Sequence, residues 1–103
     1  MIEDLKNLLA NHSFRIEAYY EMLGKYGLLA RNYQDYALSR PIDMDKEMER
    51  IETADMTLLG ALLTMCLREE YWLEGSFYGR LKAGQPQRIV ERMIEICMER
   101  NGK

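Results

Sequence analysis

A cluster of charged and aromatic residues between Arg68 and Glu74 is the part of this chain best equipped for chemistry. Glu70 and Glu74 are four residues apart, so on a helix their carboxylates lie on one face, one turn from each other. Two such carboxylates could hold a metal ion, share a proton or grip a basic partner. Tyr71 and Trp72 stand between them and would add apolar contact area.

The same cluster also has a structural interpretation, which we favour. It follows directly after an apolar run, so its residues begin at the edge of the core and are expected to be only partly solvated. Arg68 is then expected to bridge to an acidic residue of a neighbouring helix, because a half-buried charge requires a partner. The two glutamates are expected to meet basic side chains further along the chain. These are Arg80, Lys82 and Arg92.

No other group of residues suggests catalysis or a cofactor. The single histidine, His12, ends the first expected helix, where its ring suits the negative end of the helix dipole. Cys66 and Cys97 lie on apolar faces without a second ligand at metal or redox spacing, so we expect reduced thiols. The run from Asp43 imitates the start of a calcium loop, but Met48 stands in place of the turn glycine. We therefore expect no catalytic residue, no metal and no cofactor, and a protein that is not an enzyme.

Basic residues concentrate towards the carboxyl-terminal end, where residues 80–103 hold six basic and three acidic side chains. They lie on two expected helices joined by a tight glycine-containing turn, an arrangement similar to a helix-turn-helix. In such a domain the nucleic-acid contacts would be Arg80, Lys82, Arg88 and Arg92. Acidic residues at positions 91, 95 and 99 share this surface, however, and a net charge of −3 gives no general attraction to phosphates. Nucleic-acid binding is therefore the alternative function.

The elements that position these residues are predicted to be helices throughout, because glycine, proline and strand-like alternation are sparse. With 103 residues, of which 48% are hydrophobic and 30% charged, the chain is expected to form one all-α domain, residues 1–103. Five to six short helices should pack around a central apolar helix. The expected helical segments are 2–11, 14–26, 32–38, 43–53, 56–74, 76–83 and 86–100.

Capping signals define several of these boundaries. Asn32 and Asp55 are expected to cap the helices that follow them, because their side-chain oxygens can accept hydrogen bonds from free amides. Gly27 is expected at the C′ position of a Schellman cap. In that motif Leu28 and Leu23 make the accompanying hydrophobic contact.

The sequence contains no segment that suggests a membrane protein or an exported one. Its longest apolar stretch, residues 58–67, is far shorter than the roughly 20 residues that span a bilayer. The first ten residues carry acids early and lack a basic segment ahead of an apolar core, so they do not resemble a signal peptide. We expect a cytoplasmic protein that does not bind membranes.

The stretch from 54 to 92 contains a distinctive order of motifs. They are Ala-Asp at 54–55, Leu-Leu-Thr at 62–64, Arg-x-Glu-aromatic-aromatic-x-Glu-Gly at 68–75 and Ile-x-x-Arg at 89–92. This order resembles a family of small bacterial domains, the domain-of-unknown-function family numbered 6508. The chain departs from the family pattern at Tyr71 and Trp72, where arginine and phenylalanine are expected. The resemblance implies a fold but no mechanism.

The absence of a catalytic grouping favours a binding function. Seven tyrosines exceed what so small a core can bury, and exposed tyrosines suit protein interfaces because they offer large contact area at little entropic cost. The partner is expected to be another protein, and a homodimer is compatible with the same features. The expected contact residues are Tyr33, Tyr36, Arg68, Glu70, Tyr71, Trp72 and Glu74.

The favoured function is thus a small protein–protein interaction module. A phage or mobile-element inhibitor of a host defence system, with a role similar to that of anti-CRISPR proteins, is the most plausible example. The alternative is a helix-turn-helix-like regulator that uses residues 76–100.

Overall fold

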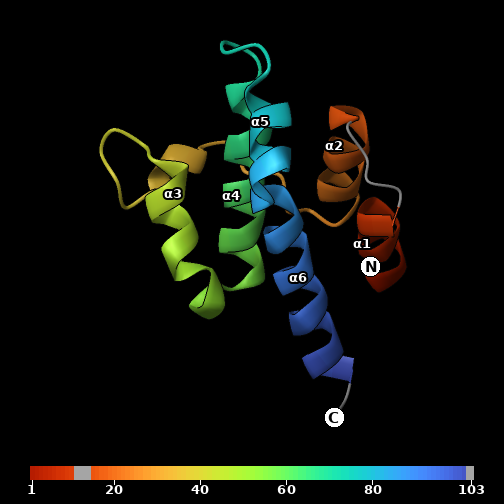
Figure 1. Ribbon diagram of the computed structural model, residues 1–103. Helices are drawn as coiled ribbons and strands as arrows, with labels where there is room; N and C mark the ends of the chain where they lie inside the picture. The colour runs from red at the N-terminus through yellow and green to blue at the C-terminus, as the bar shows by residue number, and fades with distance from the viewer. Residues whose placement is uncertain (11–14, 102–103) are drawn as a thin grey trace.

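The computed structural model describes residues 1–10 and 15–101, so His12 and its expected dipole role lie outside the described residues. Within these ranges the chain forms helices and no strand, which confirms the predicted all-α fold (Figure 1). The elements are α1 (Ile2–Ala10), α2 (Ile16–Lys25), the 3-10 helix η1 (Tyr33–Tyr36), α3 (Met44–Glu47), the 3-10 helix η2 (Met48–Thr53), α4 (Met56–Glu69), α5 (Ser76–Ala83) and α6 (Gln85–Asn101).

The centre of the fold is α4. Every residue from 59 to 67 is buried, so this helix is apolar around its whole circumference and must be covered on several sides. The covering elements are α2, η1, α3, α5 and α6, all of which contact α4. Asp55 caps its first turn as predicted, because the carboxylate accepts a hydrogen bond from the Leu58 amide at 2.8 Å.

Gly60 allows the segment after α2 to cross α4 closely. A Cβ atom at this position would lie 2.4 Å from the Leu28 carbonyl oxygen and 3.0 Å from the Leu28 Cβ, so only glycine fits without a shift. One turn further along α4, the Thr64 hydroxyl accepts a hydrogen bond from the Ala30 amide at 3.3 Å. The crossing segment, residues 28–30, is therefore held against α4 by both packing and a hydrogen bond.

The turn that leads into this segment has the predicted Schellman geometry. Gly27 has a φ of +68°, and the Leu28 amide donates to the Leu23 carbonyl at 2.8 Å. Leu23 is fully buried. The prediction for Asn32 is wrong, since its side chain makes no capping hydrogen bond to η1.

The two cysteines are free. Cys66 is fully buried in α4, and burial raises the pKa of its thiol to about 12, so the thiol is protonated at neutral pH. Cys97 on α6 is partly exposed. Among residues 1–10 and 15–101, no helix combines the length and the hydropathy that a membrane span requires.

Candidate functional site

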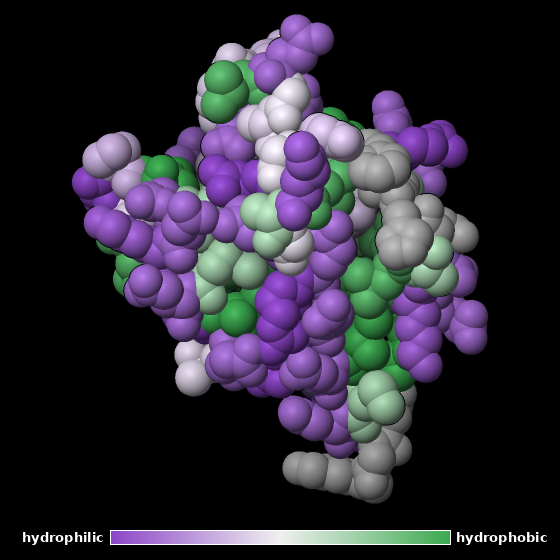
Figure 2. Space-filling model, viewed as in Figure 1, coloured by the Kyte–Doolittle hydropathy of each residue, from purple (hydrophilic) through white to green (hydrophobic). Residues whose placement is uncertain are grey.

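An exposed aromatic turn follows α4, at the top of the molecule in Figure 1. Its three consecutive side chains Tyr71, Trp72 and Leu73 are 92%, 65% and 55% exposed, and Tyr78 on α5 is 55% exposed. We call these four residues the aromatic tip. Figure 2 shows hydrophobic and hydrophilic side chains next to one another at this end of the molecule. Such a concentration of exposed apolar area marks a candidate contact surface.

Glu70 builds the turn that carries the tip. Its carboxylate accepts hydrogen bonds from the amides of Gly75 at 2.8 Å and Phe77 at 2.9 Å, which are free because they begin α5. The two amides also lower the pKa of Glu70, so the carboxylate stays ionised. Gly75 has a φ of +90°, a backbone conformation that glycine adopts most readily. Glu70 is thus a structural residue of this turn.

These hydrogen bonds explain why the central helix is shorter than predicted. The expected helix continues to residue 74, whereas α4 ends at Glu69. Continuing the helix would deprive the first amides of α5 of their acceptor. The turn instead places Phe77 in the core, where its ring meets the edge of Tyr19 at a centroid distance of 5.1 Å.

The base of the turn is held by a salt bridge that the sequence interpretation missed. Arg80 on α5 donates to both carboxylate oxygens of Glu69, with Nε to Oε1 at 2.9 Å and Nη2 to Oε2 at 3.0 Å. Its Nη1 donates to the side chain of Gln85 on α6 at 2.8 Å. Both partners of the salt bridge are partly buried, and a bidentate geometry of this kind fixes α4, α5 and α6 relative to one another.

The expected network of Arg68 with the neighbouring glutamates does not form. In the part of the chain that the structure describes, neither the Arg68 side chain nor the Glu74 side chain makes a hydrogen bond or an ion pair. Arg68 is half-buried and lies close enough to Tyr33 for its charge to oppose the rise that burial causes in the pKa of that tyrosine. The prediction failed because the glutamates have other partners. Glu69 pairs with Arg80, and Glu70 accepts hydrogen bonds from two backbone amides.

Replacing Arg68 by alanine is therefore expected to change the free energy of unfolding by no more than about 0.5 kcal/mol. No carboxylate of the described residues loses a partner when the guanidinium is removed. Arg80→Ala is the contrasting variant, because it leaves the partly buried Glu69 unpaired, and it should cost several times more. Urea denaturation of both variants tests this difference, and a loss of stability in Arg68→Ala equal to that in Arg80→Ala would contradict it.

The remaining expected contact residues do not join the tip. Tyr33 is only 7% exposed and belongs to the core, so a partner cannot reach most of it. Tyr36 is 40% exposed but lines a groove with Thr57 and Leu58 of the first turn of α4. Since α4 has 14 residues, this groove and the tip lie about 20 Å apart along the helix axis.

The basic residues of α5 and α6 are largely engaged within the protein. Arg88 binds Glu52 of η2 and lies 3.0 Å from Glu95. Arg92 lies 3.4 Å from Glu95 and 3.7 Å from Glu99. With Arg80 also paired, a nucleic acid would have to displace internal partners, so the arrangement does not favour the helix-turn-helix alternative.

Lys82 is exposed, and its ammonium lies 5.7 Å from the centre of the Tyr78 ring. Metal binding finds no support in the described ranges, which contain no group of three or more His, Cys, Asp and Glu residues able to hold an ion.

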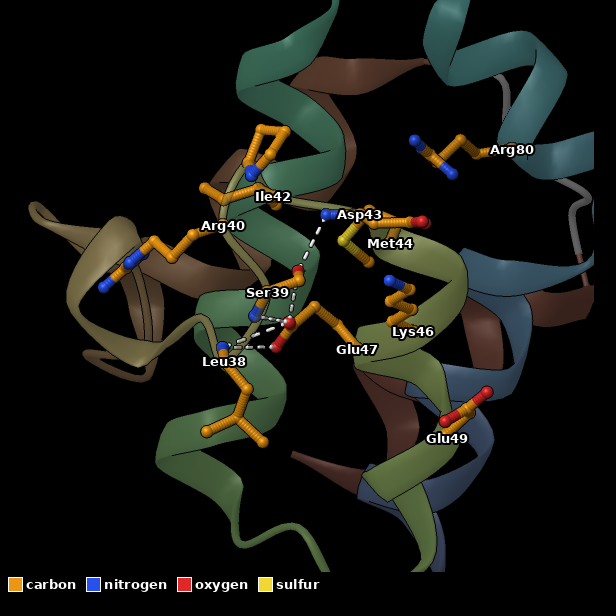
Figure 3. Close-up of a pocket in the computed structure, with 11 residues that line it drawn as sticks. Leu38, Ser39, Arg40, Ile42, Asp43, Met44, Lys46, Glu47, Glu49 and Arg80 are labelled. Atoms are coloured by element: carbon orange, nitrogen blue, oxygen red, sulfur yellow. Dashed lines mark hydrogen bonds between the residues drawn. The ribbon is translucent and has the colours of Figure 1, made fainter.

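A second candidate site is a hollow of about 720 Å³ beside the loop that precedes α3 (Figure 3). Glu47 lies at its wall with a side chain that is 1% exposed. Its carboxylate is turned towards the loop and accepts hydrogen bonds from the amides of Leu38 and Ser39 and from the Ser39 hydroxyl, at 3.1, 2.8 and 2.6 Å. Arg50 adds a salt bridge at 2.8 Å.

The hydrogen bonds from Ser39, Leu38 and Arg50 outweigh the effect of burial and lower the pKa of Glu47 to about 2. A carboxylate with so low a pKa and so many donors has no free lone pair to act as a general base, so Glu47 anchors the loop. The other charges that line the hollow have both signs. Asp43 and Glu49 are acidic, Arg40 and Lys46 are basic, and the third basic residue, Arg80, is already paired with Glu69. The hollow therefore lacks the convergent groups of a ligand site.

Comparison with known proteins identifies a family but no individual relative. No curated protein and no solved structure matches this chain. One family model covers residues 9–99, which is nearly the whole of the described fold and includes the turn that carries the aromatic tip. The chain therefore belongs to the Family of unknown function (DUF6508).

Proposed function

We propose that this protein is a protein-binding domain and that the aromatic tip is the centre of its contact surface. The observation that supports the proposal is the exposure of Tyr71, Trp72 and Leu73 in one turn. Tryptophan and tyrosine are the residues that most often dominate binding energy at protein interfaces. Exposing three large side chains in succession gives no stability to the isolated domain, whereas a partner that covered them would gain hydrophobic free energy.

The contacts that hold the turn in place support the same proposal. Two hydrogen bonds to Glu70 close the turn, and the bidentate pair of Glu69 with Arg80 holds its base. A turn that is already ordered loses little conformational entropy when a partner binds, so more of the contact energy appears as affinity.

The narrower expectation, an inhibitor of a host defence system, is part of this proposal. An inhibitor of that kind acts by occupying a surface of its target, and the tip would provide the anchor. Capture of a defence nuclease with the tagged protein from its native host would support this role, and mass spectrometry would identify the captured partner.

Replacing Trp72 by alanine is expected to weaken binding of the captured partner about 30-fold or more, which corresponds to a hot-spot loss of at least ~2 kcal/mol. The free energy of unfolding should stay within about 0.5 kcal/mol, because the ring is 65% exposed. Leu38→Ala is the matched control, since Leu38 is 73% exposed but lies on the loop before α3. Titration calorimetry with the purified partner measures both variants, and an unchanged affinity of Trp72→Ala would rule the tip out.

A further inference from the structure

We propose that the aromatic tip recognises a cationic side chain, an arginine or a lysine, in a basic segment of its protein partner. The inference rests on the proposed function and adds the chemistry of the partner. It starts from the charges around the tip. Residues 69–79 include three glutamates and no basic residue, so the sequence of the turn is locally negative.

Two of these glutamates are already satisfied and one is not. Glu69 is neutralised by Arg80 at 2.9 Å, and the Glu70 carboxylate faces the amides of Gly75 and Phe77. Glu74 is exposed and makes no hydrogen bond or ion pair within residues 1–10 and 15–101. It lies two residues from Trp72 in the same exposed segment between α4 and α5.

No positive charge of the described chain compensates Glu74. Arg80 is held by Glu69, and the charge of Arg68 acts on Tyr33, on the η1 side of α4. Lys82 lies with its ammonium over the ring of Tyr78. This last contact shows that a ring of the tip can accept a cation, whereas no cation of residues 1–10 and 15–101 lies over the larger Trp72 ring.

The combination of an exposed indole and a free carboxylate matches the chemistry of a basic side chain. A guanidinium or ammonium group over the face of tryptophan is attracted by the ring quadrupole. A carboxylate nearby adds the opposite charge, and the planar guanidinium suits both contacts, because it stacks on aromatic rings and pairs with carboxylates. Basic surfaces of this kind occur on proteins that bind nucleic acids, which agrees with the expected nuclease target.

The test uses Trp72 itself as the reporter, because it is the only tryptophan of the chain. Fluorescence of the purified protein is titrated at low salt with tetra-arginine, tetra-lysine and tetra-glutamate peptides with blocked ends. We expect a saturable change with the cationic peptides and at least a tenfold weaker response to tetra-glutamate. Glu74→Gln should weaken the binding of tetra-arginine three- to tenfold, while Glu49→Gln, which removes an exposed carboxylate from η2, should leave it unchanged.

An equal response to the acidic and basic peptides, or the same affinity for tetra-arginine in Glu74→Gln as in the natural sequence, overturns the inference. Measurements on the captured partner separate it from the proposed function. If Trp72→Ala disrupts that complex and Glu74→Gln does not, the tip is a contact surface for a group that is not cationic, and this inference alone fails. If Trp72→Ala leaves the complex intact, the proposed function fails as well.

Discussion

Replacement of Glu47 by glutamine is expected to lower the free energy of unfolding by about 3 kcal/mol. The buried carboxylate accepts hydrogen bonds from Leu38, Ser39 and Arg50, and the variant leaves the partly buried Arg50 guanidinium without its counter-charge. The pKa difference gives a similar magnitude, since Glu47 titrates at about 2 in the fold against an ordinary value of 4.5. Denaturant unfolding at neutral pH measures the loss.

The sign of the pH dependence follows from the same values. A carboxylate whose pKa is lowered in the fold binds fewer protons there than in the unfolded chain, so its contribution is complete above about pH 4.5 and is lost as the pH falls towards 2. The natural protein should therefore lose stability over this range more steeply than Glu47→Gln. Glu49→Gln, with an exposed side chain two residues away, is the control and should change stability by less than about 0.5 kcal/mol. Equal stability of the two variants would show that Glu47 is not an anchor.

The second large effect is expected from Gly60→Ala, which should cost about 1–3 kcal/mol. The added methyl would lie 2.4 Å from a backbone oxygen of Leu28, and a backbone atom cannot rotate away as the end of a flexible side chain can. The crossing segment would have to move away from α4 and weaken the hydrogen bond between Ala30 and Thr64.

Gly79→Ala makes this prediction specific. Gly79 also lies inside a helix, but a Cβ at that position meets nothing within 4 Å. Because alanine favours helix over glycine by about 1 kcal/mol, this variant should gain stability while Gly60→Ala loses it. Thermal melts of the two variants compare the same substitution in two surroundings. A higher melting temperature in both would mean that the crossing segment can move away from α4 at little cost in free energy.

Features that depend on a few neighbouring residues were predictable from the sequence. The Schellman cap at Gly27 and the cap of α4 by Asp55 follow from local backbone chemistry, and both are present. The predicted helices 2–11, 76–83 and 86–100 agree with α1, α5 and α6 to within one residue at each end. In each case an apolar stripe and a terminating residue act over only one or two turns.

Features that depend on contacts between elements were missed, although two of them leave a signal. Glu47 stands at a position of the apolar stripe formed by Met44, Met48 and Ile51, where a charged residue is unexpected unless it has buried partners. Gly60 interrupts an apolar helix, which is typical of a close backbone approach.

No pattern in the sequence indicates that Glu69 is the partner of Arg80. Several acidic residues precede it, and only the turn at 70–75 decides which of them it meets. Of the expected contact residues, Tyr71 and Trp72 are exposed, whereas Tyr33 is part of the core.

The packing of α1 against α6 has a consequence for the way the chain folds during synthesis. The ribosome makes α1 well before α6, yet Leu5 and Leu8 of α1 are buried in a core to which α6 contributes Ile89, Val90 and Met93. Until α6 leaves the exit tunnel, the nascent domain lacks the helix that completes the cover over those leucines, and this side of the core is open to chaperones and proteases. The domain thus completes its core only after α6 has been synthesised, because the contacts between α1 and α6 join segments that are far apart in the sequence.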